Sequence, residues 1–198
     1  YLHKQFTMPL YNFCNTHKEK FMSQSTPARY SPLMVTLHWL TAILVFAAFI
    51  VGKNMSRLPN HDASKLAPLA IHMMLGITML VVIVVRFVAR RKTPHPAYAS
   101  TGNAFLDGLG KFAHYALYLL VFLMAISGMA LSMQAGLPQI VFGGAGSLPA
   151  DFFDFAARAM HGFIAPALFL LILLHVGAAF YHQLALKDNL LSRMWYGK

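Results

Sequence analysis

Carboxylates, cysteines and charge of any kind are scarce in this sequence. Only six of the 198 residues are Asp or Glu, charged residues make up 11%, and Cys14 is the single cysteine. One cysteine excludes a disulfide framework and a cysteine-ligated zinc or iron–sulfur site. No grouping of carboxylates with a nucleophile points to covalent catalysis, so any metal chemistry must depend on histidine, methionine or the few carboxylates.

Apolar residues, in contrast, are abundant. The sequence is 58% hydrophobic with a mean hydropathy of +0.55, which is the composition of a membrane protein. A formal net charge of +10 is also typical of proteins that bind nucleic acid. The basic residues, however, cluster at the ends of apolar segments, where they mark orientation and contact lipid headgroups. We therefore expect membrane lipid, and not nucleic acid, to surround this chain.

Four apolar stretches predict the fold. Each has 20 or more residues, enough to cross a hydrocarbon core of about 30 Å. The sequence therefore predicts an all-α membrane protein, a bundle of four transmembrane helices at about residues 33–52, 69–89, 112–133 and 155–182. The connections between them are polar, basic or rich in Gly and Pro, and none is long enough for a soluble domain.

The polar segment before the first apolar stretch predicts a disordered leader over residues 1–28, followed by one four-helix domain over 29–198. It lacks the apolar core of a secretory signal peptide. Because Met22 opens a segment typical of a natural start, residues 1–21 are expected to be an upstream extension. Both termini are predicted to be cytoplasmic, since of the 16 Lys and Arg residues the opposite side holds only Lys53, Arg57, Lys65 and Arg158.

Histidines lie inside the apolar stretches, where a polar ring without a partner costs several kcal/mol. His161 and His175 occur in the last stretch, about 21 Å apart on nearly the same helical face. Such a ring is satisfied either by a hydrogen bond to a neighbouring helix or by a metal ion. Small residues beside both rings, Gly162 and Gly177 among them, favour a bulky flat ligand.

The predicted topology gives each histidine a depth. His38 falls near the inner face and His72 near the outer face, so His38 pairs with His175 and His72 with His161. Two imidazoles that face each other from different helices can hold a b-type haem by bis-axial coordination. We therefore predict two haems b, with Gly76 leaving room for the outer porphyrin. Zinc fits less well, because it normally requires four ligands converging on one point.

Two further histidines have more than one interpretation. His114, near the inner end of the third stretch, could replace His38 as a ligand, bond a haem propionate or bond a quinone. His182 lies about 10 Å closer to the cytosol than His175 and either reaches lipid headgroups or binds a quinone. Arginines at the helix ends are predicted to neutralise haem propionates, namely Arg86 and Arg90 on the inner side and Arg57 and Arg158 on the outer side.

From about Arg29 to the end, the order and spacing of several motifs resemble the bacterial cytochrome b561 family. They are Leu37-His-Trp-Leu40, Ile71-His72 followed by Gly76, Ala113-His-Tyr-Ala-Leu-Tyr118, Met160-His-Gly162, Leu174-His175 and Lys187-Asp-Asn. The resemblance implies a di-haem b protein of the bacterial inner membrane that passes electrons between the quinone pool and a second redox partner. It also implies that His38, His72, His161 and His175 are the ligands and that His114 and His182 flank the quinone.

Three functions are weighed on these grounds. One branch of the family resembles superoxide oxidase, which would take an electron from periplasmic superoxide, attracted by the outer basic residues, and reduce ubiquinone. Another branch provides the cytochrome b membrane anchor of a partner hydrogenase or dehydrogenase. A histidine relay in a proton or metal transporter is the third. It would need ionisable residues through the midplane, where these stretches are almost purely apolar.

Overall fold

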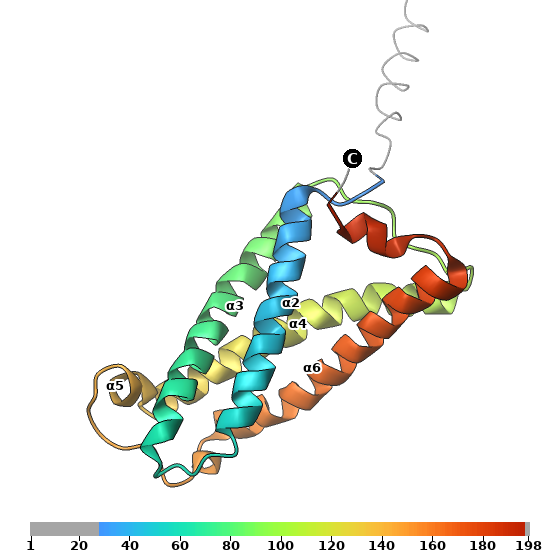
Figure 1. Cartoon of the computed structure of the whole chain (residues 1–198). Coiled ribbons are helices and arrows are strands. Elements are labelled where there is room, and N and C mark those ends of the chain that lie inside the picture. Colours follow the sequence, from blue (N-terminus) through green and yellow to red (C-terminus); the bar gives the residue numbers. More distant parts are fainter. Residues whose placement is uncertain (1–27, 197–198) are drawn as a thin grey trace, which may run out of the picture.

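The computed structural model describes residues 28–196, in which helices predominate and no strand occurs (Figure 1). The four long helices are α2 (Pro32–Met55), α3 (Leu66–Lys92), α4 (Ala104–Gln134) and α6 (Ala156–Tyr181). Each is long and apolar enough to cross a membrane, which confirms the predicted four-helix bundle. Residues 1–27 of the predicted leader lie outside the described part of the chain.

Polar caps mark the start of two of the four long helices, α2 and α4. Ser31 caps α2 by accepting a hydrogen bond from the Met34 amide at 3.4 Å, and Pro32 occupies the first turn, where no amide hydrogen is needed. Asn103 caps α4 and accepts from the amides of Phe105 and Leu106. As a result α4 begins at Ala104, not near residue 112 as hydropathy alone predicts, because Asp107 and Lys111 in the first turns lower the local hydropathy.

The end of the bundle opposite the described chain ends is the one that the sequence predicts to be outer (Figure 1). It carries the short elements η1 (Ala63–Lys65), α5 (Leu137–Val141) and η2 (Phe152–Asp154). Lys65 is buried there, with 7% of its surface exposed. Its Nζ donates to the Leu58 carbonyl at 2.8 Å and to Asn60 Oδ1 at 2.6 Å. Asn60 in turn donates to the Ala150 carbonyl, so this lysine joins two connections and is withdrawn from the surface.

At the other end, α6 continues into a π-helical turn, η3 (His182–Leu186), and the chain then reverses through Lys187 and Asn189, both at φ 55°. The following η4 (Leu190–Met194) returns across the start of α2. Trp39 Nε1 donates to the Met194 carbonyl at 2.9 Å, and the Tyr30 amide donates to the Arg193 carbonyl at 3.1 Å. The two ends of the described chain therefore lie at the same end of the bundle, and the cytoplasmic side of that end stays a prediction.

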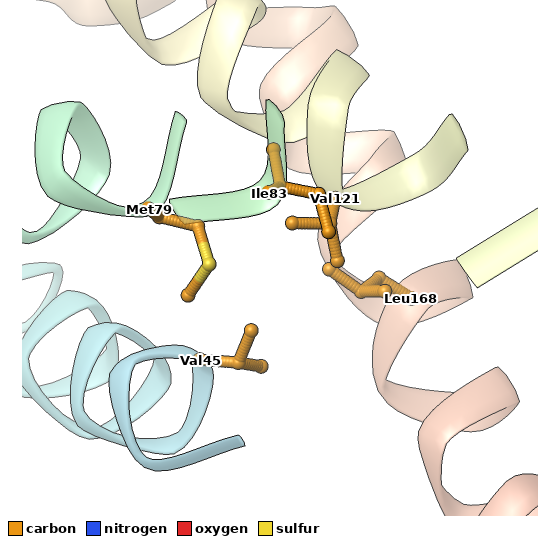
Figure 2. Close-up of a cluster of buried hydrophobic side chains, with 5 residues drawn as sticks. All are labelled: Val45, Met79, Ile83, Val121 and Leu168. Carbon is orange, nitrogen blue, oxygen red and sulfur yellow. The ribbon is translucent and has the colours of Figure 1, made fainter. Parts of the chain in front are cut away.

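Helix packing leaves an asymmetric interior. α2 packs along α3, α4 packs along α6, and α3 contacts α4, whereas α6 makes hardly any close backbone contact with α2 or α3 over the described residues. One side chain or more from each long helix forms a central apolar cluster (Figure 2), made of Val45, Met79, Ile83, Val121 and Leu168. Leu168 lies seven residues from both His161 and His175, so this cluster separates the two histidine levels.

Candidate metal-binding histidine pairs

The outer level brings His72 of α3 and His161 of α6 together. Their ring centroids lie 6.1 Å apart, and the ring planes form an angle of 82°. Both side chains come from helices whose backbones barely touch, so the imidazoles themselves bridge the space between α3 and α6. The rings of these two residues, which the sequence analysis paired by depth, therefore lie close together.

The inner level is built in the same way from His38 of α2 and His175 of α6. Their ring centroids are 6.4 Å apart, and the ring planes form an angle of 64°. His175 is shared, because the ring of His114 on α4 also lies 5.1 Å from it. Three histidines therefore meet at the inner level, and two meet at the outer level.

The spacing of the rings tests what each pair can hold. A metal ion with bonds of about 2 Å to one nitrogen of each ring needs ring centroids about 6 to 6.5 Å apart. The outer distance of 6.1 Å and the inner distance of 6.4 Å both meet this requirement. The 5.1 Å between His114 and His175 is too short for an ion in between. Ring spacing therefore favours His38 over His114 as the partner of His175.

A serine fixes the proton on His161. Ser127 Oγ donates its hydrogen to the Met124 carbonyl at 3.0 Å, so it can only accept from His161 Nδ1, which lies 3.1 Å away. The Nδ1 atom of His161 therefore carries the proton, and Nε2 keeps the lone pair that a metal ion requires. Ser127 has no counterpart in the sequence-based predictions, although a buried serine in an apolar helix beside a histidine is a recognisable signal.

His72 has no such hydrogen-bond partner on Nδ1. Its Nδ1 atom is buried and makes no hydrogen bond, although it lies near the Ala48 carbonyl on α2. A buried ring nitrogen without a partner is costly, and ligation of Nε2 would fix the Nδ1 proton toward that carbonyl. The environment of His72 thus fits a metal ligand better than a purely structural histidine.

Arg86 contacts the inner pair directly. Its Nη2 donates to His38 Nδ1 at 2.8 Å, and its guanidinium lies 5.2 Å from the centre of the Tyr118 ring. Ligation through Nε2 of His38 would place a proton on Nδ1, so the guanidinium must then turn to another acceptor. Arg86 Nε and the Tyr118 hydroxyl are both buried without a partner, and together they fit an acidic group such as a haem propionate.

The second predicted inner arginine, Arg90, lies in the same basic region. Its guanidinium donates to the hydroxyls of Tyr30 and Tyr98 at 3.4 and 3.0 Å, and Lys111 lies over the Tyr98 ring. Burial raises the pKa of Tyr98, but hydrogen bonding at its hydroxyl and the nearby positive charges outweigh burial and leave the pKa below its ordinary value. Over residues 28–196 no carboxylate forms a salt bridge with Arg90 or Lys111, so the region suits an anionic group.

The two predicted outer arginines differ. Arg158 lies one turn before Gly162 with its guanidinium over the Phe153 ring, and a side chain on Gly162 would come within 2.6 Å of its Nη1 atom. The Arg158 side chain therefore lies along α6 near His161. Arg57 is exposed in the connection between α2 and η1 and is not held toward the histidine pair.

His182 is locked by a carboxylate that the sequence-based predictions did not include. Its Nδ1 donates to Asp188 Oδ2 at 2.6 Å across the chain reversal after α6. His182 is 9% exposed, so it lies inside the fold and not among lipid headgroups. Asp188 is one of only six acidic residues in the chain, and this scarcity is the signal that could have identified it.

The proton of His114 also has a defined position, on Nδ1. Its Nδ1 donates to the Gly110 carbonyl at 2.7 Å, so Nε2 is left with a free lone pair. Within the described residues no three His, Cys, Asp or Glu side chains are arranged to hold a metal ion. The two ring pairs, in contrast, suit an ion whose remaining ligands come from a macrocycle.

Comparison with known families gives a match over nearly all of the described chain. The family described as "Prokaryotic cytochrome b561" matches residues 29–197. A similar protein is "Cytochrome b561 homolog 2" of Escherichia coli (strain K12), 31% identical over 175 residues, which cover 86% of this chain and 93% of that protein.

Two other relatives are similar to this chain over almost the same length. "Probable superoxide oxidase CybB" of Yersinia pestis is 30% identical over 170 residues, covering 84% of this chain and 95% of its own. "Cytochrome b562" of Cereibacter sphaeroides is 32% identical over 170 residues, covering 83% of this chain and 94% of its own. In each case nearly the whole relative is matched.

Proposed function

The chain belongs to the prokaryotic cytochrome b561 family, whose members are multi-pass proteins of the bacterial inner membrane that transfer electrons with b-type haem, and from this we propose its specific activity. It holds two haems b, one at each histidine level, and carries electrons from a donor on the outer side to ubiquinone on the inner side. The observation that carries this proposal is the spacing of the two ring pairs, 6.1 and 6.4 Å.

In this proposal His72 and His161 ligate the outer iron, and His38 and His175 ligate the inner iron. When bound, such haems supply one-electron redox chemistry at a potential set by the axial imidazoles, nearby hydrogen bonds and burial. Arg86 and Arg90 neutralise the inner propionates, and Arg158 neutralises an outer one. Arg57 contributes only to the positive charge of the outer surface.

Other residues separate the two histidine levels and fix the position of the His161 proton. The apolar cluster around Leu168 lies between the two levels. Ser127 holds the proton of His161 on Nδ1, as the ligand role requires. The apolar cluster also argues against the third function considered, because a proton or metal relay needs ionisable groups at this depth.

Ubiquinone is proposed to bind between His114 and His182. Asp188 keeps the His182 proton on Nδ1, so Nε2 carries a lone pair that accepts a hydrogen bond from a quinol hydroxyl. Reduction of the quinone to the quinol requires two electrons and two protons. A histidine paired with a carboxylate at this end of the bundle is suited to pass protons to the quinone. The 2.6 Å contact and the burial of His182 support this role.

Superoxide is the proposed outer donor, as the name of the relative from Yersinia pestis suggests. Oxidation of superoxide to dioxygen releases one electron, so two superoxide anions supply one quinol. Lys53, Arg57 and Arg158 attract the anion to the outer end. Lys65 is not available for this, because both of its hydrogen bonds are made inside the connection.

The decisive experiment uses the purified protein in detergent. Reduction with dithionite should give a b-type spectrum with about two haems per chain, and addition of superoxide should reduce ubiquinone in a stopped-flow assay. A colourless protein contradicts the proposal as a whole. Two haems without superoxide-driven quinone reduction, together with a co-purifying dehydrogenase, would instead support the membrane-anchor function.

Replacement of Ser127 by alanine should weaken the outer haem alone. The substitution removes the acceptor for the His161 Nδ1 proton, and loss of such a partner typically lowers metal affinity about 10- to 100-fold. Redox titration should show a shifted or depleted outer component and an unchanged inner component. Ser132→Ala, at another buried serine of α4, is the matched control and should leave both components unchanged.

A further inference from the structure

Each outer histidine ring lies against a glycine of the neighbouring helix. A Cβ atom built on Gly52 of α2 would come within 3.0 Å of His72 Cε1 and 3.3 Å of its Nδ1. A Cβ atom on Gly128 of α4 would come within 3.0 Å of His161 Cε1 and 3.4 Å of its Nδ1. The same arrangement thus occurs twice, on two different helix pairs, and in both cases the edge that carries Nδ1 faces the glycine.

Both glycines follow a backbone carbonyl by one helical turn. Ala48 precedes Gly52 by four residues, and its carbonyl lies near His72 Nδ1. Met124 precedes Gly128 by four residues, and its carbonyl accepts from Ser127 Oγ, the partner of His161 Nδ1. In a helix the Cβ atom of a residue tilts back over the preceding turn, so any side chain at these positions would cover that carbonyl.

Close packing against glycine also sets the distance between the rings. A contact of 3.0 Å is tighter than nearly all real Cβ contacts, so a methyl group at either position would have to push the imidazole by a few tenths of an ångström. The ring would move away from the glycine or rotate. A ring spacing of 6.1 Å lies within the narrow range that accommodates an iron, so either movement disturbs ligation.

We propose that Gly52 and Gly128 are positioning residues for the outer haem. Gly52 lets the His72 imidazole pack closely against α2, and Gly128 lets the His161 imidazole pack closely against α4. With the ring seated, Nδ1 faces a backbone or hydroxyl acceptor and Nε2 faces the space between α3 and α6. This inference rests on the proposed haem function, but it assigns a role to residues that contact neither the iron nor the porphyrin.

The inner pair is seated differently. Within the described residues, the glycines nearest in sequence to the inner histidines, Gly110 and Gly177, have nothing within 4 Å of a built Cβ atom, and no glycine meets His38 or His175. His38 instead contacts the Arg86 guanidinium. The effect of substituting Gly52 or Gly128 should therefore be confined to the outer haem, and the inner haem reports in the same sample whether the variant is folded.

The test compares Gly52→Ala and Gly128→Ala with wild type and with Gly108→Ala, a control on the exposed first part of α4 where a Cβ atom meets nothing. His72→Ala identifies which spectral component is the outer haem. In the two glycine variants the outer component should transfer to an excess of apomyoglobin about 10- to 100-fold faster, with a shifted midpoint potential, while the inner component is unchanged. Gly108→Ala should match wild type in both measurements.

The outcomes separate this inference from the proposed function. If wild type lacks two haems, the proposed function fails. If wild type has two haems and both glycine variants keep the outer component with an unchanged potential and transfer rate, the seating role is refuted. Equal loss of both haems in the glycine variants also refutes it, because the predicted effect is local to one level.

Discussion

His175→Ala and His38→Ala should each remove the same haem, the inner one, and lower the haem content from about two to about one per chain. The reason is geometric, because the two rings lie 6.4 Å apart and a single iron needs both of them. His72→Ala and His161→Ala should remove the other haem, since their rings lie 6.1 Å apart. The measurement is haem per chain by the pyridine haemochromogen assay, with redox titration to identify the remaining component.

Double variants test whether the two histidines of a pair bind the same iron. His38→Ala combined with His175→Ala should lose no more haem than either substitution alone, because both act on one site. His38→Ala combined with His72→Ala should leave the protein without haem. The loss of different components from His38→Ala and His175→Ala would show that the rings do not share an iron.

His114→Ala provides the control for the inner level. Its ring lies 5.1 Å from His175, too close for an iron between them, so the variant should keep both haems. Retention of the inner haem in His38→Ala together with its loss in His114→Ala would identify His114 as the ligand instead. His95→Ala, in the polar connection between α3 and α4, should resemble wild type throughout.

His182→Ala should slow ubiquinone reduction about 100-fold while both haems remain bound. Its ring holds a proton through the 2.6 Å bond to Asp188, and the loss of a positioned proton-transfer group typically costs a factor of about 100 or more. The rate of quinone reduction is measured by stopped-flow after prereduction of the haems, so that superoxide chemistry does not limit it. Asp188→Asn should give a smaller loss, because the amide oxygen still accepts from Nδ1 but carries no charge.

The control for this expectation is the reduction of the haems themselves. In His182→Ala the rate at which an outer donor reduces the haems should match wild type, because neither histidine level contains this residue. An unchanged rate of quinone reduction in both His182→Ala and Asp188→Asn would place the quinone site elsewhere. Loss of the inner haem in His182→Ala would show a structural role in place of a proton-transfer role.

The sequence by itself determined the fold class. Hydrophobic stretches of 20 or more residues can be satisfied in a bilayer only as helices, and this reason is local enough to be read from composition and length. The depth of each histidine followed too, since position along a spanning helix is position across the membrane. The start of α4 was misplaced because its first turns are held by the polar cap at Asn103, which hydropathy does not register.

The tertiary structure decided which partners each imidazole meets. His38 and His114 have the same depth and the same chemistry, and only the distances of 6.4 and 5.1 Å to His175 distinguish them. Ser127, Gly52 and Gly128 belong to none of the quoted motifs, and the Lys187-Asp-Asn motif does not by itself give Asp188 a partner. Their importance arises from the neighbours that helix packing and the reversal after α6 bring to them. Depth follows from the one-dimensional order of residues in a helix, whereas contact between helices depends on their rotation and separation, which no single segment encodes.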